Sequence, residues 1–494
     1  MSAAAVCLAT MGAIVAVGAA LGFLAGVRRR MDLEQWTVAG RGFGVVLVFL
    51  LMTGEVYTTF TFLGLSGWTY SRGAPTLYGL AYLSLAYVVS FFILPPIWEV
   101  GRRHGMQTQS DFFRVRYRSR ALTALVCIIG IAAFVPYVQL QITGLGIIVS
   151  IASFDTVGRT PAMAITMVLL VGFVFAGGVR AVAWVSVLKD ALMLIAALAI
   201  GLGLPLLFFG GIGPMFAALI AARPAHLTMP GATSNLGHAW YVSTVLLTSL
   251  GFFMWPHGFG AAFTARNADT LRRNAVVMPL YSLSLACMFF AGFTALLVIP
   301  GLANGDLAML TLVRRSFPPW FLGLIGGAGA LTAMVPAAIF ILTAATLFAK
   351  NLYRPLIAPA MTDDQVARLA RGTVVVLGSV SLALAIFTST TLVSLLLIGY
   401  AGVSQFFPGV VLGLYWRRVT AGAVLIGVLA GVVTAMALML THHDPCFGVN
   451  AGFLALCLNF LLVVLLSVVG PVRNTGPDAS LDAFELRASV GYQL

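Results

Sequence analysis

Two apolar stretches of the chain contain residues that a membrane-crossing helix does not tolerate without partners. Residues 45–70 are interrupted by the run TGEVYTT at 53–59, and residues 240–265 by WPHG at 255–258. Glycine, proline and ionisable side chains at mid-depth require protein or water to satisfy the polar groups that they free or carry. The sequence therefore predicts two broken helices whose polar atoms bind an ion or a small solute.

The elements that must position these breaks are membrane spans. The chain is 60% hydrophobic and 9% charged, and its mean hydropathy is +1.02. Apolar runs long enough to cross a core of roughly 30 Å recur throughout. We expect an all-α polytopic membrane protein with about 13 transmembrane helices, at residues 6–27, 43–70, 74–98, 121–152, 160–178, 181–210, 239–265, 276–300, 318–349, 372–387, 389–415, 420–440 and 451–472.

The net charge of +13 reports topology rather than a nucleic-acid partner. Most of the lysines and arginines fall in alternate loops, whereas the other set of loops carries only Arg72, Arg159, Arg223, Arg314 and Arg315. Basic residues concentrate in cytoplasmic loops. The expected partner is therefore the lipid bilayer, and no nucleic acid, with the N-terminus outside and the C-terminus in the cytoplasm.

Several function classes lack support in the sequence. No GxxxxGK[ST] motif indicates ATP-driven pumping, and the five cysteines show no metal spacing. No nucleophile and base, and no cluster of metal ligands, fall at a common membrane face. We therefore expect no enzyme activity, no catalytic residue, no metal centre and no cofactor.

Five short segments resemble the solute:sodium symporter family. They are GLSG at 64–67, GGVRAVAW at 177–184, NLYRP at 351–355, QFFP at 405–408 and GLYWRR at 413–418. The resemblance covers about 35–470. It implies alternating access around a mid-membrane site built by two five-helix repeats of opposite orientation, and both broken stretches indeed open a block of five spans.

The same resemblance implies a division of the chain and a location. The expected parts are an N-terminal helix and basic loop at 1–42, a first repeat at 43–210, an outside loop at 211–238, a second repeat at 239–418, two C-terminal helices at 419–472 and a cytoplasmic tail at 473–494. Within the family, YTTFTFLG at 57–64, VLKD at 187–190 and WPH at 255–257 are most similar to the bacterial monocarboxylate permease branch. That branch carries lactate, pyruvate and related short acids, which implies the bacterial cytoplasmic (inner) membrane and a chain that functions as a monomer.

The ion-coupling positions depart from the family pattern. Sodium-using members bind the ion between backbone carbonyls at the first break, here Gly54 and Tyr57, and two hydroxyls that fall here on Val335 and Pro336. Sodium is a hard cation that requires oxygen ligands, and neither side chain offers one. Thr332, one turn earlier, supplies at most one of them.

Lys189 and Asp190 lie inside the apolar run 181–210, where a lysine marks function by default. We hypothesise that the Lys189 ammonium replaces sodium and faces the carbonyls of Gly54 and Tyr57. Because burial disfavours the charged form, the lysine could couple transport to H⁺, with Glu55 as counter-ion or second proton carrier. Two alternatives are a permanent structural Lys–carboxylate pair and a lysine that snorkels to the cytoplasmic edge.

A small carboxylate requires hydrogen-bond donors, and polar side chains near the breaks could provide them. His257 could donate to a carboxylate or instead bond backbone freed by Pro256, and Tyr137 and Gln141, which share a helix face, could bind substrate or join helices. The candidate substrate contacts are Thr58, Thr59, Thr61, Tyr137, Gln141, Trp255 and His257.

The resulting hypothesis is a symporter that imports short monocarboxylates such as lactate, pyruvate, acetate or propionate, coupled to protons. The alternatives are a Na⁺-coupled symporter of another small solute, such as an amino acid or a sugar, and a transporter-like ligand sensor. Flux separates them, because a sensor binds its ligand without accumulating it.

Overall fold

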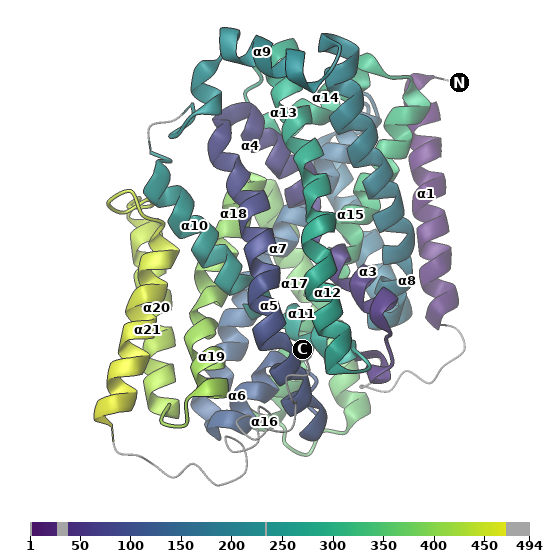
Figure 1. Cartoon of the computed structure of the whole chain (residues 1–494). Coiled ribbons are helices and arrows are strands. Elements are labelled where there is room, and N and C mark those ends of the chain that lie inside the picture. Colours follow the sequence, from purple (N-terminus) through teal and green to yellow (C-terminus); the bar gives the residue numbers. More distant parts are fainter. Residues whose placement is uncertain (1, 27–37, 233–234, 471–494) are drawn as a thin grey trace.

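The computed structural model describes residues 2–26, 38–232 and 235–470, apart from the side chains at 25, 26, 173 and 176–181. This part of the chain is a bundle of helices that contains no named strand. Ten of its helices are long and apolar enough to cross a membrane, or eleven if the bent pair of the first break is one span. In Figure 1, α1 lies at one edge of the bundle and α20 and α21 at the opposite edge.

The first half of the chain contains the first break. Its elements are α1 (Ala3–Gly26), η1 (Ala39–Arg41), α3 (Val45–Val56), η2 (Phe60–Gly64), α4 (Leu65–Arg72), η3 (Ala74–Leu77), α5 (Tyr78–Arg103), α6 (Gln109–Tyr117), α7 (Arg120–Ala152), α8 (Arg159–Phe209), α9 (Ile212–Ala222) and η4 (Pro224–Leu227).

The second half contains the second break. Its elements are α10 (His238–Gly251), η5 (Phe252–Met254), α11 (Pro256–Thr264), α12 (Ala268–Ser282), η6 (Leu283–Leu285), α13 (Ala286–Val298), η7 (Gly305–Leu307), α14 (Ala308–Ser316), α15 (Pro319–Thr346), η8 (Leu347–Tyr353), α16 (Arg354–Leu356), α17 (Asp363–Phe387), α18 (Leu392–Val403), η9 (Ser404–Phe406), α19 (Phe407–Tyr415), α20 (Ala421–Leu440) and α21 (Ala451–Val469).

The count of spans differs from the sequence prediction at two places in the described chain. The predicted spans 160–178 and 181–210 form one continuous helix, α8, and the predicted span 239–265 is divided at the second break into α10, η5 and α11. A helix interrupted at mid-depth leaves pieces that do not each cross the hydrocarbon core. Composition locates such a stretch but does not show where its helix stops.

Helix α15 forms the centre of the bundle. Its most apolar window is 89% buried, whereas that of α1 is 11% buried. Glycines bring the neighbours of α15 close: a Cβ at Gly323 would lie 2.5 Å from the Cys7 carbonyl oxygen of α1, and one at Gly329 would lie 2.9 Å from the Phe62 ring. Small residues allow membrane helices to pack backbone against backbone, so α15 is held against both α1 and the first break.

The first break results from a local loss of helical geometry. Helix α3 ends at Val56, Tyr57 is extended (φ −84°, ψ 100°), and the chain resumes as the π-helix η2 before α4. The two halves, Val45–Val56 and Phe60–Arg72, are bent by 50° relative to each other. The carbonyl groups at the end of α3 therefore lack the intrahelical partners that a continuous helix provides.

The second break is set by a proline. Trp255 is extended (φ −62°, ψ 133°), and Pro256 is the first residue of α11. Proline suits the first turn of a helix because its missing N–H would have no helical partner there. It restricts the residue before it to extended geometry, which explains why the chain breaks at Trp255.

Two glycines close the bundle at the end that carries α14. A Cβ at Gly67 of α4 would lie 2.7 Å from the Asp306 backbone nitrogen, and one at Gly305 would lie 2.4 Å from the Gly67 carbonyl oxygen. The Asp306 carboxylate also accepts a hydrogen bond from the Leu392 N–H at the start of α18, at 3.3 Å. The loop between α13 and α14 therefore joins α4 to α18.

A buried acid fastens the opposite end of the bundle, where α6 and α16 lie (Figure 1). Asp111 completes a capping box with Thr108 at the start of α6 and accepts hydrogen bonds from Asn351 at 2.9 Å and Lys350 at 3.0 Å. Burial alone would raise the pKa of Asp111, but Lys350 and the N–H donors outweigh it and the pKa is lowered. The ionised carboxylate thus ties α6 to η8.

Candidate ion and solute site

The Lys189 ammonium of α8 lies against the carbonyls of the first break. Its Nζ donates to the Gly54 oxygen at 2.9 Å and the Tyr57 oxygen at 3.1 Å, and lies 2.9 Å from Asp190 Oδ1. The side chain is 0% exposed. Three acceptors match the three donors of an ammonium group. A lysine with these contacts does not snorkel to the membrane edge, which removes one of the three sequence-based alternatives.

Asp190 and Gly54 complete this contact between α3 and α8. Asp190 Oδ2 accepts a hydrogen bond from Thr53 Oγ1 at 2.8 Å. A Cβ at Gly54 would lie 2.9 Å from Ser186 Oγ and 3.6 Å from Lys189 Nζ. The glycine therefore lets α8 pack closely against α3 beside the ammonium, because a larger residue would press on Ser186 Oγ.

Glu55 contacts His257 rather than Lys189. It was predicted to act as counter-ion of Lys189 or as a second proton carrier; Asp190 lies beside the Lys189 ammonium, and Glu55 Oε2 lies 3.5 Å from His257 Nε2. Neighbouring residues of a helix project about 100° apart. Glu55 therefore faces away from α8 and toward α11, and its contact with His257 joins the two breaks.

The three threonines after the first break satisfy local backbone groups rather than pointing into free space. Thr61 Oγ1 donates to the Val56 and Thr58 oxygens, both at 3.0 Å, and accepts from the Thr58 N–H. Thr58 Oγ1 accepts from the Phe60 N–H at 3.2 Å, and Thr59 Oγ1 donates to Gln141 Oε1 at 2.8 Å. Breaking the helix frees backbone groups that need partners, and these hydroxyls supply some of them; their role as substrate contacts stays a prediction.

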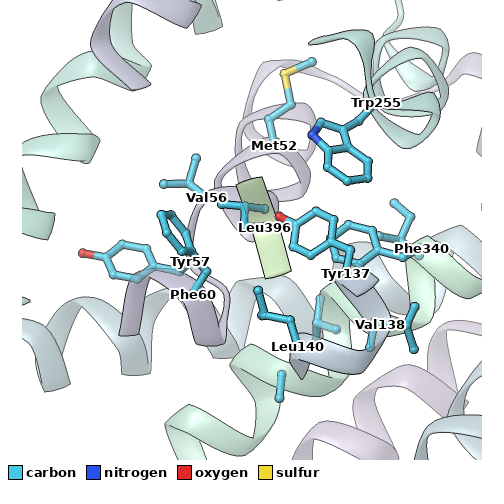
Figure 2. Close-up of a cluster of buried hydrophobic side chains, with 14 of the residues drawn as sticks. Met52, Val56, Tyr57, Phe60, Tyr137, Val138, Leu140, Trp255, Phe340 and Leu396 are labelled. Atoms are coloured by element: carbon cyan, nitrogen blue, oxygen red, sulfur yellow. The ribbon is translucent and has the colours of Figure 1, made fainter. Parts of the chain in front are cut away.

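Aromatic side chains of α7, α15 and the two breaks belong to one cluster of buried hydrophobic residues (Figure 2). The Tyr137 ring of α7 lies 4.7 Å from Trp255 and 4.1 Å from Phe340 of α15, measured between centroids. His257 lies 4.6 Å from Phe340. The sequence analysis did not identify Phe340, because nothing distinguishes it from other apolar residues of an apolar span until α15 is placed beside the breaks.

Several buried polar atoms near the breaks have no hydrogen-bond partner within the described residues, among them Glu55 Oε1, Gln141 Nε2, Trp255 Nε1 and His257 Nδ1. An unsatisfied buried donor or acceptor costs about 1–3 kcal/mol, and such groups commonly mark a site that another molecule completes. Trp255 and His257 at the second break and Gln141 of α7 thus carry unpartnered nitrogen atoms, and Glu55 at the first break carries an unpartnered carboxylate oxygen.

The residues present do not fit a sodium ion at the position that the family pattern indicates. The Gly54 and Tyr57 carbonyls already accept from Lys189, and Val335 and Pro336 carry no oxygen in their side chains. Thr332 Oγ1 is buried without a partner, and it supplies one ligand only. Across residues 2–26, 38–232 and 235–470, no group of three or more His, Cys, Asp or Glu could hold a metal ion.

A helical membrane bundle with two broken helices joined at a buried charged centre defines the class of secondary transporters. The chain belongs to the sodium:solute symporter family, whose model matches residues 36–431. Its relatives are transporters rather than enzymes.

Relatives with similar sequences extend over nearly the whole chain. The uncharacterized symporter YhjB of Bacillus subtilis (strain 168) is 44% identical, covering 91% of this chain and 94% of its own. The monocarboxylate transport permease protein of Rhizobium johnstonii is 27% identical over 92% of this chain and 94% of its own. The sodium/pantothenate symporter of Escherichia coli (strain K12) is 24% identical over 91% and 92%.

Solved structures share the fold. A Na⁺-coupled sialic acid symporter in its substrate-bound outward-open state superposes with a TM-score of 0.79 and 14% sequence identity, covering 96% of this chain and 99% of that one. Identity this low supports the arrangement of helices and says nothing of the solute carried.

Proposed function

We propose that this protein is a proton-coupled symporter that imports short monocarboxylates, such as lactate, pyruvate, acetate or propionate, by alternating access. The observation that carries the proposal is the Lys189 ammonium bound to the Gly54 and Tyr57 carbonyls. A fixed positive charge in that place removes the need for a sodium ion. In a buried setting the charge depends on one proton, so loss and gain of that proton change the same contacts that an ion would make and break.

The second break supports an anionic solute. Gln141 Nε2, Trp255 Nε1 and His257 Nδ1 are buried and without partners, and all can donate to a carboxylate when the His257 proton is on Nδ1. The aromatic residues Tyr137 and Phe340 suit the short apolar part of such an acid. Half-helix N-termini at the breaks also favour negative charge. In the same direction, one relative is named a monocarboxylate transport permease.

Glu55 links the solute to a proton in this proposal. An anionic solute beside an ionised Glu55 would be repelled, by about 4 kcal/mol for unit charges 4 Å apart at an effective dielectric constant of 20. A proton shared by Glu55 and His257, whose atoms lie 3.5 Å apart, removes that repulsion. The solute and the proton would then bind together, which is the requirement for symport.

The proposal extends to the placement of the chain. Two inverted five-helix repeats at 43–210 and 239–418 would rock around the breaks, in the bacterial cytoplasmic membrane, with the N-terminus outside and one chain sufficient for transport. A second candidate, a Na⁺-coupled symporter of another small solute, is favoured by one observation: Thr332 Oγ1 is buried without a partner beside the family's sodium position.

The test is uptake of labelled lactate, pyruvate and acetate into proteoliposomes, with a proton gradient or a sodium gradient imposed separately. We expect accumulation with a proton gradient in sodium-free buffer, and none with a sodium gradient at equal pH on both sides. Accumulation that requires sodium would overturn the coupling mechanism and support the second candidate. Binding of an acid without accumulation would indicate a sensor, and the absence of both would discard the substrate class.

A further inference from the structure

A cavity of about 390 Å³ opens at the end of the bundle where α6, the start of α7, η8 and α16 meet. This is the end that the distribution of basic residues assigns to the cytoplasm. It lies apart from the two breaks and takes no part in the proposed transport chemistry. Its lining includes Arg114, Arg120, Lys350 and Arg354, with Asp111 and Leu356.

The cavity has an excess of positive charge. Its one lining acid, Asp111, is already matched by Lys350 at 3.0 Å and by N–H donors from Asn351 and the backbone of Gln107 and Thr108. The Arg114 side chain is 63% exposed and only 3.4 Å from the same carboxylate. Arg354 pairs with the exposed Asp363. Arg120, exposed at the start of α7, adds a further cation that no carboxylate in the described residues balances.

The rim of the cavity is apolar. Pro355, Leu356 and Pro359 line it, and Leu356 and the adjacent Ile357 are 54% and 66% exposed. Arginine guanidinium groups bind phosphate oxygens in pairs of parallel hydrogen bonds. Basic pockets between membrane helices on the cytoplasmic side bind lipid head groups. Cationic lining residues beside exposed apolar residues therefore suit a phosphate group that carries acyl chains.

We propose that this cavity binds a phosphate-bearing anion, and that its occupant is the head group of an anionic phospholipid, with the acyl chains against Leu356 and Ile357. The phosphate bridges Arg114 and Arg120 at the α6–α7 corner to Arg354 after η8. A soluble phosphate compound shares the recognised chemistry but does not use the apolar rim.

Binding at this cavity reaches the transport machinery through two contacts. Gln109 Nε2 of α6 donates to the Met254 carbonyl oxygen, at 2.7 Å, directly before the second break. On the other side of the cavity, η8 continues α15, the helix that carries Thr332 and Phe340. An occupant that holds α6 against η8 is expected to change the turnover rate more than the apparent affinity for solute.

The test compares the full-length protein with the double variant R114Q/R120Q in a neutral detergent. Lys350 is left intact because it fastens Asp111. The measurement is the thermal unfolding midpoint as phosphatidylglycerol, phosphatidylcholine or glycerol 1-phosphate is added. The matched control is R368Q/R371Q, which removes two exposed arginines from α17 outside the cavity. R114K/R120K keeps the charge and removes the paired geometry.

We expect phosphatidylglycerol to stabilise the wild type and the control at the same concentration, and R114Q/R120Q only at about tenfold higher concentration, with R114K/R120K between them. Equal responses of wild type and R114Q/R120Q, or an equal loss in R368Q/R371Q, would overturn the site. Stabilisation of the wild type by glycerol 1-phosphate as strong as that by the lipid would overturn the lipid assignment and leave a soluble phosphate site. If R114Q/R120Q does not fold, the comparison of R114K/R120K with the control gives the same decision.

Discussion

The molecule contains two lysine–aspartate pairs with similar distances between their charged atoms and different surroundings. Lys189 lies 2.9 Å from Asp190 and Lys350 lies 3.0 Å from Asp111. The Lys189 side chain is 0% exposed, and its remaining donors reach backbone carbonyls of a broken helix. Lys350 is 18% exposed, and its other partner is the Gln107 side chain.

The difference shows how one chemical pair serves two purposes. Asp111 receives donors from Asn351 and from the backbone of its own cap, so loss of Lys350 leaves it hydrogen-bonded. Loss of Lys189 leaves two carbonyls and a carboxylate buried with fewer partners. Breaking a buried pair from one side costs about 3–5 kcal/mol, and the cost is smaller at Asp111 because three N–H donors remain there. Lys189 and Asp190 therefore lie where the proposed coupling charge is needed, whereas Lys350 and Asp111 hold α6 against η8.

The substitution Lys189→Met tests the difference between the two lysine–aspartate pairs, and it has the largest expected effect. We expect uptake of the labelled acid to fall at least about 100-fold, because a loss of about 3 kcal/mol corresponds to a factor of this order. Lys350→Met, the matched control, should retain uptake within about threefold. Proteoliposome uptake normalised to incorporated protein is the measurement. Full pH-dependent accumulation by Lys189→Met would exclude the proton role, and equal losses in both variants would show that the two pairs do not differ.

A second substitution tests the neighbouring contact between Glu55 and His257. His257→Gln keeps a donor and an acceptor but cannot share a proton with Glu55. We expect the apparent KM for lactate to rise about tenfold, because a hydrogen bond to a charged group contributes roughly 1.5–3 kcal/mol. Asn351→Ala, which removes a hydrogen-bond donor from Asp111 in the contact between α6 and η8, should leave the KM unchanged. An unchanged KM in His257→Gln would remove this residue from the solute site.

A third acid, Asp306, is buried with no lysine or arginine in hydrogen-bonding contact among the described residues, and it gives the smallest expected effect. Burial raises the pKa of Asp306 to about 6, although the Leu392 N–H and Arg159 partly oppose it. The carboxyl of an unfolded chain has a pKa near 3.9, so between about pH 3.9 and pH 6 the folded protein binds more protons at Asp306 than the unfolded chain does. The free energy of unfolding therefore decreases as pH rises, and the stabilising contribution of protonated Asp306 is lost above about pH 6. Asp306→Asn should remove this slope and be more stable than the wild type at pH 7 by roughly 1–3 kcal/mol.

The measurement for Asp306→Asn is the thermal unfolding midpoint in detergent from pH 4 to 7. Asp155→Asn, an exposed acid that pairs with Arg314 at the same end, is the control and should keep the wild-type slope. A slope in Asp306→Asn equal to that of the wild type would assign the pH dependence to other groups.

The sequence was sufficient to identify the two breaks because proline, glycine and ionisable residues within apolar runs are visible without a structure. It also placed Lys189 opposite Gly54 and Tyr57, where the structure has it. It did not predict that Asp190 would pair with the residue beside it and leave Glu55 to His257, because the choice depends on how α3 and α8 are rotated. The structure shows the protein partners of the three threonine hydroxyls, and their role as solute contacts stays a prediction. A donor near a break is equally suited to a solute and to the freed backbone, and only coordinates show which it meets.

The glycine contact between α4 and the α13–α14 loop has a consequence for the cost of each transport cycle. Ordering a long side chain costs up to about 2 kcal/mol of conformational entropy, and ordering a glycine costs none beyond its backbone. Gly67 and Gly305 meet through backbone atoms alone. In the proposed alternating-access cycle, such a contact is made and released without ordering a side chain at either glycine. Close packing of backbone atoms therefore joins these two segments at no cost in side-chain entropy at the two positions.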